Sequence, residues 1–369
     1  MKKFFLLLWP LAAVAALAVE QIDVFTSGQD GYHTYRIPAI VRAQDGALLA
    51  FCEGRKKGGG DSGDIDLLLK RSADGGRTWG PAQVVWDDAG NTCGNPCPVV
   101  DRETGTISLL LTWNRGDDVE RNIIAQTSHD TRRIFVTQSK DHGRTWVKPV
   151  EITTAVKRPD WTWYATGPGA GIQIERGPHR GRLVIPCDHI EAGSKKYYSH
   201  VIHSDDRGKT WQLGGRTPQD QVNECEVVEL TDQRLLLNMR NYDRTKQTRQ
   251  QAISGDGGAT WTEQRHVPEL VEPICQASIR RLTWPEAGRP GVLVFSNPAS
   301  LKREKLTVYT STDEGTSWRS LLQLHAGPAA YSCLVALSPT EAGCLYERGE
   351  KRAYEKITFA RFPVPAAGR

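Results

Sequence analysis

One eight-residue phrase recurs five times in this 369-residue chain and limits what the chain can fold into. The copies are SADGGRTW, SKDHGRTW, SDDRGKTW, SGDGGATW and STDEGTSW, and they begin at residues 72, 139, 204, 254 and 311. Their starting points are 67, 65, 50 and 57 residues apart. Self-similarity at such a spacing predicts an architecture built from one repeated structural unit.

Each copy, which we call an Asp box, has the features of a hairpin turn. It follows a short strand-like run, and its last residue, a Trp, opens another extended piece. The Asp side chain can accept hydrogen bonds from nearby backbone N–H groups, the shared Gly can adopt positive φ, and the Trp provides an apolar anchor. A calcium loop of the EF-hand type is excluded because its spacing and its closing Glu are missing. We therefore interpret the five aspartates as structural.

The segments between the boxes also have the pattern of strands, and helical periodicity is scarce. Four strands per repeat at this spacing are typical of a β-propeller blade. Residues 19–369 divided among six blades give about 58 residues per blade, close to the observed intervals. The sequence predicts an all-β, six-bladed propeller forming a single domain over 19–369, with four antiparallel strands in each blade. The N-terminal segment QIDVF would close the last blade, which explains five boxes for six blades.

The first 18 residues, MKKFFLLLWPLAAVAALA, have the pattern of a secretory signal peptide: a basic start, an apolar run and an Ala-Leu-Ala end. The chain is therefore predicted to be exported, to a periplasm or to the medium. The apolar run is short for a membrane span, and no other stretch qualifies. Removing this segment takes away two lysines and no acidic residue, so the formal net charge falls from +4 to +2. Such a balance predicts no nucleic-acid partner.

The cysteines leave two interpretations open. Export permits disulfides, yet their positions in strand-like segments equally suit buried free thiols. Cys93 and Cys97 form the nearest pair, and no second pair or His cluster completes a zinc site. We expect no structural metal at this pair. The eight cysteines are Cys52, Cys93, Cys97, Cys187, Cys225, Cys275, Cys333 and Cys344.

The predicted topology separates the boxes from another set of loops. If each box joins the third and fourth strands of a blade, the other loops lie at the opposite face. Those loops contain arginines, carboxylates and one tyrosine that could converge on a central depression, the usual ligand site of such a fold. The candidates are Arg36, Glu53, Arg55, Asp61, Glu224, Arg240, Arg303, Tyr331 and Glu347.

These residue types indicate a particular chemistry. Convergent guanidinium groups favour an anionic ligand, since they match a carboxylate geometrically and keep their charge. An acid such as Asp61 can protonate a leaving oxygen if its pKa is raised above the reference of about 3.9. A Tyr beside a carboxylate can act as a nucleophile. A neutral phenol suits a substrate with a carboxylate on its anomeric carbon, because an anionic nucleophile would be repelled.

Several motifs together resemble the exo-α-sialidases, or neuraminidases, of the bacterial and animal propeller type. They are YRIPAI, GGGDSGDIDLLLKRS, the five boxes, NECEVVEL, SNP followed by REKLTV, AYS and CLYE. One box alone is a weak signal, because other secreted hydrolases and receptors carry it. The complete ordered set is specific, and it covers almost all of residues 19–369.

The resemblance implies how a substrate is held. Arg36, Arg240 and Arg303 match the three arginines that bind the sialic acid carboxylate. Glu347 matches the acid that steadies the first of them. The implied partners are sialylated glycans, glycoproteins or glycolipids, and the implied reaction is hydrolysis of a terminal α-linked sialic acid with retention.

The resemblance also implies the reacting groups. Tyr331 matches the nucleophile that forms a covalent tyrosyl intermediate, Glu224 its partner base, and Asp61 the general acid/base. Glu53 and Arg55 match further pocket residues. Sialidases are a known exception to the rule of two catalytic carboxylates. The resemblance also implies that no metal and no organic cofactor takes part in the chemistry.

Neighbouring residues keep some assignments open. Asp64 or Asp66 could be the acid in place of Asp61, and Glu226 lies on the same strand face as Glu224. The aromatic segment DWTWYATGPG at 160–169 could contact the sugar or pack between blades.

Two other functions also compete with hydrolysis. A trans-sialidase would transfer the sugar to another acceptor or to its own hydroxyl group. A non-catalytic sialic-acid-binding propeller would keep the arginines but typically lose the Tyr or the acid, whereas this chain has both.

Overall fold

The computed structural model describes residues 18–366, so the predicted signal peptide lies almost entirely outside the described residues. Within residues 18–366, no helix is long and apolar enough to cross a membrane. The only helices there are two short ones, α1 (Glu120–Ala125) and α2 (Thr153–Val156), and the remaining elements are strands. The prediction of an all-β chain is confirmed.

The strands pair antiparallel with their sequence neighbours in successive runs of four. The first run contains β2 (Thr34–Arg42), β3 (Leu48–Arg55), β4 (Ile65–Ser72) and β5 (Gln83–Trp86). The next contains β6 (Thr92–Val100), β7 (Ile107–Asn114), β8 (Arg133–Ser139) and β9 (Val150–Glu151). A third contains β10 (Trp161–Thr166), β12 (Leu183–Glu191), β13 (Tyr197–Ser204) and β14 (Gln212–Arg216), with β11 (Ile172–Gln173) also on β12.

Three further runs follow, and the last two share one long strand. One run contains β15 (Val222–Glu229), β16 (Leu235–Asn241), β17 (Thr248–Ser254) and β18 (Thr262–Val271). Another contains β19 (Ser278–Thr283), β20 (Val292–Pro298), β21 (Glu304–Ser311) and β22 (Arg319–Ser338). Strand β22 pairs with β21 through its first half and with β23 (Glu341–Arg348) through its second half. Then come β24 (Lys356–Pro363) and β1 (Glu20–Thr26).

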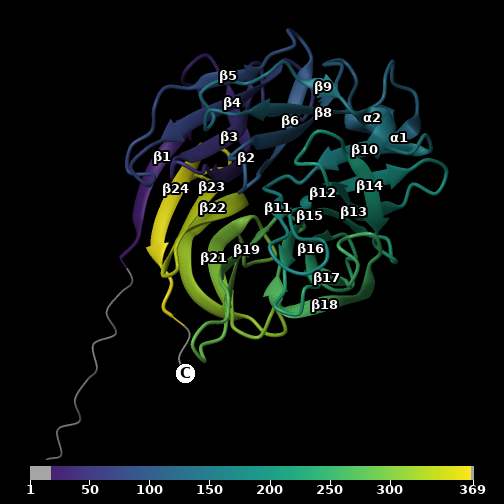
Figure 1. The fold of residues 1–369 in the computed structure, drawn as a ribbon. Coiled ribbons are helices and arrows are strands. Elements are labelled where there is room, and N and C mark those ends of the chain that lie inside the picture. The colour runs from purple at the N-terminus through teal and green to yellow at the C-terminus, as the bar shows by residue number, and fades with distance from the viewer. Residues whose placement is uncertain (1–17, 367–369) are drawn as a thin grey trace, which may run out of the picture.

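The two ends of the chain meet in one sheet. Strand β1 pairs antiparallel with β24, with Glu20 opposite Arg361 and Ile22 opposite Phe359. Figure 1 shows the sheets following one another round the molecule, so that purple β1 lies beside yellow β24. The prediction that the N-terminal strand completes the last group of strands is confirmed.

Each Asp box joins the third and fourth strands of its run, as predicted. In the first box, Asp74 Oδ1 accepts hydrogen bonds from the Thr78 backbone N–H and the Ser72 hydroxyl, at 2.9 and 2.8 Å. Asp74 Oδ2 accepts one from the Thr78 hydroxyl at 2.6 Å, while the Gly76 N–H donates to the Ser72 hydroxyl oxygen. The equivalent contacts recur in the other four boxes. The aspartates therefore brace turns.

The box aspartates should give the fold an acid-sensitive component of stability. Burial raises the pKa of Asp206, but hydrogen bonds from Thr210 and Ser204 outweigh it and lower the pKa to about 2. Since the folded value lies below the unfolded value of about 3.9, this stabilisation is present above about pH 4 and lost towards about pH 2. We expect Asp206→Asn to lower the thermal midpoint by a few degrees at pH 7. The difference from the wild type should shrink in melts recorded at successively lower pH, and a pH-independent difference would contradict this account.

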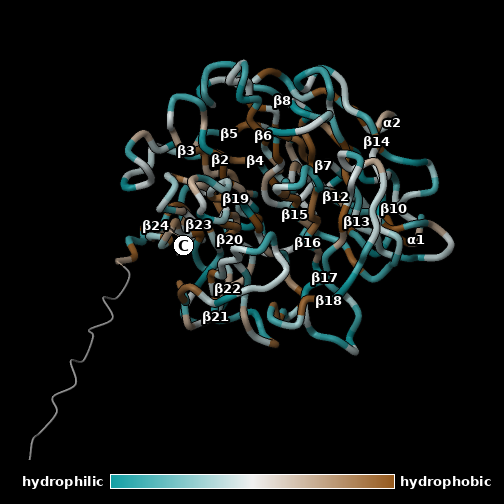
Figure 2. Tube along the Cα trace, turned by 60° about the horizontal axis from the view of Figure 1, so that its bottom comes forward, coloured by the Kyte–Doolittle hydropathy of each residue, from teal (hydrophilic) through white to brown (hydrophobic). Residues whose placement is uncertain are grey.

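The box tryptophans connect neighbouring runs. The Trp79 ring lies 5.5 Å from that of Phe359, and the Trp146 ring lies 5.7 Å from that of Phe51. Edge-to-face contacts of this kind add to the stabilisation from burial. Figure 2 shows hydrophobic segments concentrated in the strands and hydrophilic ones in the loops. Each box thus fixes a turn and places an aromatic ring against the adjacent run.

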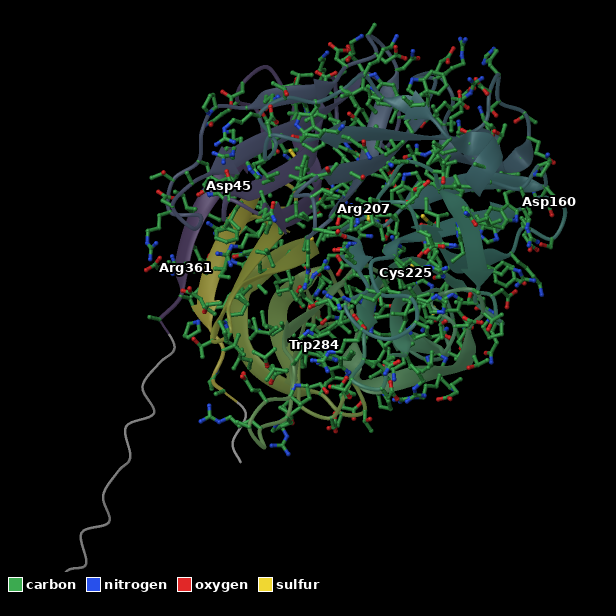
Figure 3. The ribbon with its side chains drawn as sticks, in the orientation of Figure 1. Asp45, Asp160, Arg207, Cys225, Trp284 and Arg361 are labelled. Carbon is green, nitrogen blue, oxygen red and sulfur yellow. The ribbon has the colours of Figure 1, made fainter. Side chains whose placement is uncertain are left out.

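All eight cysteines are buried free thiols. Cys225, which is buried, lies near the centre of the view in Figure 3, whereas Asp160 and Arg361 lie near the outline of the molecule. Of the two interpretations left open by the sequence, the structure supports packing of buried thiols.

The register of the sheets places boxes and candidate residues at opposite ends. In the β3–β4 pair, Ser72 of the first box lies opposite Leu48, at the start of β3. Arg55 lies opposite Ile65, at the other end of the same pair. The end that carries Arg55 is where the candidate residues gather.

Candidate active site

A β-bulge recurs in the first strand of five runs and sets the positions of the candidate residues. In each bulge two residues lie opposite one residue of the second strand. A bulge bends the strand and redirects its side chains, and bulges are common beside active sites. The paired residues are Ile37–Pro38 in β2, Asn95–Pro96 in β6, Thr162–Trp163 in β10, Asn223–Glu224 in β15 and Ala330–Tyr331 in β22.

The bulges surround one cavity of about 160 Å³. Eight of the nine residues predicted from the sequence line it: Arg36, Glu53, Arg55, Asp61, Glu224, Arg240, Arg303 and Tyr331. The ninth, Glu347, lies behind Arg36 and opposite the β22 bulge. The structure therefore brings the predicted set together, and the catalytic and binding roles remain predictions.

Glu347 joins two bulged strands. Its carboxylate accepts hydrogen bonds from Arg36 Nε at 2.8 Å and from the backbone N–H groups of Ile37 and Tyr331, at 2.9 and 3.0 Å. Glu347 is fully buried, and Arg36 is 6% exposed. A buried carboxylate that accepts from three donors is held in one orientation and fixes the guanidinium direction. Arg36 is thereby held rigidly at the cavity wall.

Arg303 is held by Tyr354, an aromatic residue that the sequence analysis did not select. Its Nη1 donates to the Tyr354 hydroxyl oxygen at 2.6 Å, and its Nη2 donates to the Ile274 carbonyl oxygen at 3.2 Å. The Arg36 guanidinium also lies over the Tyr354 ring, 4.1 Å from its centre. Neither contact uses a carboxylate, so the positive charge of Arg303 remains available to an anionic ligand.

Tyr331, Glu224 and Arg240 form a compact hydrogen-bonded group. The Tyr331 hydroxyl donates to Glu224 Oε1 at 2.6 Å, and Arg240 Nη1 donates to Glu224 Oε2 at 2.6 Å and to the Tyr331 oxygen at 2.9 Å. Burial, followed by the charge of Glu224, raises the pKa of Tyr331 well above its usual value. The phenol is therefore neutral, with a carboxylate positioned to remove its proton.

Asp61 stands at the open edge of the cavity, with its side chain 63% exposed. Its Oδ1 lies 2.8 Å from Arg55 Nη2 and 3.8 Å from Arg36 Nη1. Burial raises the pKa of Asp61, but Arg55 and Arg36 outweigh that effect and lower it. The sequence argument required a raised pKa for Asp61 to act as a general acid. In the structure, the guanidinium groups of Arg55 and Arg36 lower this pKa instead.

The alternative carboxylates take structural positions. Lys56 Nζ lies 3.1 Å from both Asp64 and Asp66, and neither lines the cavity. Glu226 is fully buried and accepts hydrogen bonds from the backbone N–H groups of Ala170 and Ile279. The geometry therefore favours Asp61 and Glu224 over their neighbours.

Six further polar residues line the cavity that the sequence analysis did not select: Asn95, Glu120, Arg132, Asp188, Asn223 and Tyr242. Trp163, left open by the sequence, also lines it, whereas Trp161 stacks on His189 with ring centres 3.4 Å apart. Burial lowers the pKa of Arg132 to about 10. Arg132 hydrogen-bonds the side chains of Asn95 and Asn114 and lies over the Trp163 ring, 4.1 Å from its centre.

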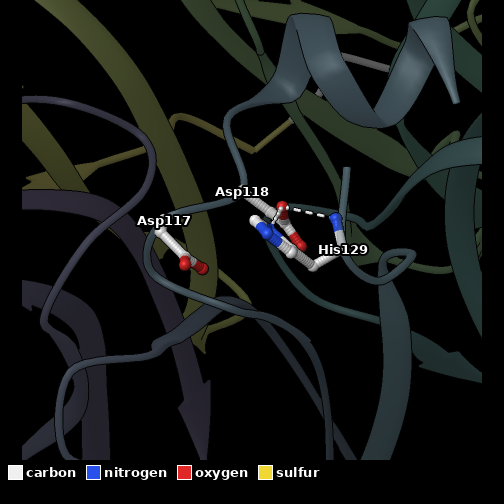
Figure 4. A group of neighbouring side chains, drawn as sticks. All are labelled: Asp117, Asp118 and His129. Atoms are coloured by element: carbon white, nitrogen blue, oxygen red, sulfur yellow. Dashed lines mark hydrogen bonds and ion pairs between the residues drawn. The ribbon is translucent and has the colours of Figure 1, made fainter. Parts of the chain in front are cut away.

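One group of potential metal ligands lies beside helix α1. Figure 4 shows Asp117, Asp118 and His129, whose ligand atoms lie within 4.8 Å of one another. Asp118 already accepts hydrogen bonds from the backbone N–H groups of His129 and Asp130, both at 2.9 Å, and Asp117 pairs with Arg115 at 2.9 Å. These contacts stabilise the loop that contains Glu120.

Comparison with known proteins gives a consistent assignment. The family described as BNR repeat-like domain matches residues 46–344. The chain is 35% identical to a sialidase of Micromonospora viridifaciens over 92% of its own length and 53% of that protein. It is 31% identical to Sialidase-3 of Mus musculus, over 89% of this chain and 91% of that one. The chain thus spans about half of the bacterial relative and most of the mammalian one.

A solved structure extends the agreement to three dimensions. The structure named Hadza microbial sialidase Hz136 superposes with a TM-score of 0.82 at 30% identity, covering 92% of this chain and 68% of that one. The matched family, the relatives and the fold all lead to one conclusion: this chain belongs to the sialidase family of glycoside hydrolases.

Proposed function

We propose that this chain is a retaining exo-α-sialidase that releases terminal α-linked sialic acid from glycans, glycoproteins or glycolipids. The observation that carries the proposal is the 2.6 Å hydrogen bond from the Tyr331 hydroxyl to Glu224 inside a cavity lined by Arg36, Arg240 and Arg303. An arginine-rich pocket alone would suit any anion. A neutral phenol paired with a base suits attack on an anomeric carbon that bears a carboxylate.

The three arginines would bind the carboxylate of the sugar. Arg36 is oriented by Glu347, and Arg303 has no carboxylate within ion-pair distance among the described residues. Binding would place the anomeric carbon next to the Tyr331 oxygen. Positioning of this kind removes much of the entropic cost of the attack.

The reaction would then proceed in two displacements. Glu224 takes the phenolic proton as the Tyr331 oxygen bonds to the anomeric carbon, and Asp61 gives a proton to the departing glycosidic oxygen. In the second step a water attacks the same carbon, Asp61 takes its proton, and Glu224 returns a proton to the released phenolate. Two inversions give net retention.

The lowered pKa of Asp61 is compatible with this role once substrate is bound. Arg55 and Arg36 are the groups that lower it, and Arg36 is one of the carboxylate-binding arginines. A bound carboxylate offsets the positive charge of Arg36, and exclusion of water strengthens the effect of burial, which favours the neutral acid. Substrate binding would thus prepare the proton donor.

We also propose that the strand runs are the blades of a closed six-bladed propeller. First strands of successive runs contact one another: β2 with β6, β6 with β10, β15 with β19, β19 with β22, and β22 with β2. The pairing of β1 with β24 supports the same closure. The signal-like pattern of residues 1–18 supports export to a periplasm or to the medium.

The direct test is identification of the product from a natural sialoside such as 3′-sialyllactose. We expect free sialic acid, with the α anomer appearing first in a time-resolved proton NMR experiment. A transferred or 2,7-anhydro sugar would instead indicate a trans-sialidase. Sialic acid binding by folded protein without any turnover would indicate a non-catalytic binding protein.

Asp61→Asn should affect substrates according to their leaving groups. A sugar leaving group needs a proton, so we expect kcat/KM for 3′-sialyllactose to fall by about 10²- to 10⁴-fold. The acidic 4-methylumbelliferone needs little proton assistance, so its sialoside should lose much less. Steady-state kinetics on both substrates checks the prediction, with Asp64→Asn as the matched control. Equal losses on the two substrates would exclude Asp61 as the acid.

A further inference from the structure

Asp188 is a cavity residue that the proposed reaction does not use. It lies in β12, is 1% exposed, and lines the same cavity as Tyr331 and Glu224. Neither of its carboxyl oxygens has a hydrogen-bond partner among the described residues. Buried polar atoms without partners are rare and costly in folded proteins, so such a group facing a cavity is a candidate ligand contact.

The neighbours of Asp188 in its sheet leave its carboxyl group free. Across β10 it lies opposite Ala165, whose small side chain also lines the cavity. Across β13 it lies opposite Ser199, whose hydroxyl donates to the Asn223 carbonyl oxygen instead. Asn223 Oδ1, also at the cavity, has no partner either. Two unpaired polar groups thus share one part of the wall.

The electrostatic surroundings favour a neutral acid at this position. Burial raises the pKa of Asp188 well above its usual value, and the nearby charges of Glu224 and Glu120 raise it further, against Arg240 and Arg132. No ion pair holds Asp188 among residues 18–366. A neutral carboxyl group offers one O–H donor and an acceptor oxygen, which is the complement of a hydroxyl group.

We propose that Asp188 is a specificity-determining residue that binds one hydroxyl group of the substrate sugar, donating one hydrogen bond to it and accepting another. This inference rests on the proposed function. Arg36, Arg240 and Arg303 suit a carboxylate, while Asp188 and Asn223 present unpaired oxygen atoms to the same cavity. A sialic acid carries its carboxylate at one position and its hydroxyl groups elsewhere, at C4 and on the side chain at C6.

The test combines protein variants with modified substrates. The variants are Asp188→Asn, which keeps shape and both hydrogen-bonding functions without charge, and Asp188→Leu, which keeps approximate volume only. The substrates are three 4-methylumbelliferyl sialosides: complete, 4-deoxy, and with the C6 side chain shortened by two carbons. Because all share one leaving group, differences in kcat/KM report on recognition of the sugar.

We expect Asp188→Leu to lower kcat/KM for the complete sialoside by about 10- to 100-fold, mainly through KM. Asp188→Asn should stay within about threefold of the wild type. For the one analogue that lacks the bound hydroxyl, the wild type should itself be slower, and Asp188→Leu should add no further loss. If Asp188 had only a structural role, we would not expect near-normal kcat/KM in Asp188→Asn together with no further loss in Asp188→Leu on one analogue.

Two results would overturn the inference. An equal loss on all three substrates would show that Asp188 binds neither the C4 hydroxyl group nor the hydroxyl groups removed from the C6 side chain, and a loss in Asp188→Asn as large as in Asp188→Leu would show that its negative charge is required. Asp101→Asn serves as the control, because Asp101 is equally buried but hydrogen-bonded to Thr104 and Gln173, away from the cavity. Absence of turnover by the wild type on every substrate would refute the proposed sialidase activity instead.

Discussion

Tyr331→Phe should lower kcat for sialoside hydrolysis by about 10²- to 10⁴-fold while leaving the fold intact. The substitution removes the attacking oxygen and the proton that Glu224 accepts at 2.6 Å. The ring remains, with the guanidinium groups of Arg36 and Arg303 still 4.9 and 5.6 Å from its centre. Substrate binding should therefore persist, and KM should change far less than kcat. Stopped assays with 3′-sialyllactose and a thermal melt on the same preparation check both statements.

The matched control is Tyr346→Phe. Tyr346 is fully buried, and its hydroxyl donates a hydrogen bond to the side chain of Gln21 at 2.9 Å. It does not line the cavity. Its variant should lose some stability and keep kcat. Full activity of Tyr331→Phe would remove the phenol from the mechanism and leave the cavity as a binding site only.

Two glutamates on one strand should respond oppositely to substitution. Glu226→Ala should lower the free energy of unfolding by about 3–5 kcal/mol, because it leaves several buried donors without an acceptor. Those donors are the backbone N–H groups of Ala170 and Ile279 and the hydroxyl of Ser278, at 3.0, 2.8 and 2.8 Å. Arg280, 3.7 Å away, would also lose its carboxylate partner.

Glu224→Gln is the comparison variant. It keeps the shape of the side chain and an oxygen that can accept from Arg240, and it removes a negative charge close to Asp188, so we expect a smaller loss of stability than in Glu226→Ala. It cannot take the phenolic proton of Tyr331, so kcat should fall by about 10²-fold or more. Denaturant unfolding and kinetics on both variants separate the two effects. A stable Glu226→Ala or a fully active Glu224→Gln would contradict the division between fold and chemistry.

The repeated strands and turns could be predicted from the sequence because the residues that define them lie close together in the chain. The Asp box combines a hydroxyl, a carboxylate, a glycine and a tryptophan within eight residues, so one short phrase defines each turn. Strand order then placed Arg55 and the boxes at opposite ends of the sheets. The nine selected residues met around one cavity because their motifs lie at one end of successive strands.

Other parts of the cavity had no local signal. Asp188 ends the strand-like run RLVIPCD, and Arg132 adjoins another strand-like segment, so both have the pattern of ordinary strand positions. Alternation along a strand predicts which face a side chain takes, but a bulge shifts that alternation by one residue. The lowered pKa of Asp61 was also out of reach, because it depends on distances to Arg55 and Arg36 that arise only in the folded chain.

The recurring bulges indicate which positions beside the cavity can be substituted while the sheets keep their pairing. The pairs β3–β4, β7–β8, β12–β13, β16–β17 and β23–β24 run in unbroken register, whereas the irregularity beside the cavity is confined to two residues of each first strand. Variation in those few positions can alter the contacts offered to a sugar while the rest of the sheet keeps its pairing. Two of the five dipeptides contain the proposed base Glu224 and the proposed nucleophile Tyr331, and these should stay constant. A laboratory evolution experiment for a new glycan preference should therefore accumulate its successful changes in the other three dipeptides, and libraries restricted to them should retain mostly foldable members.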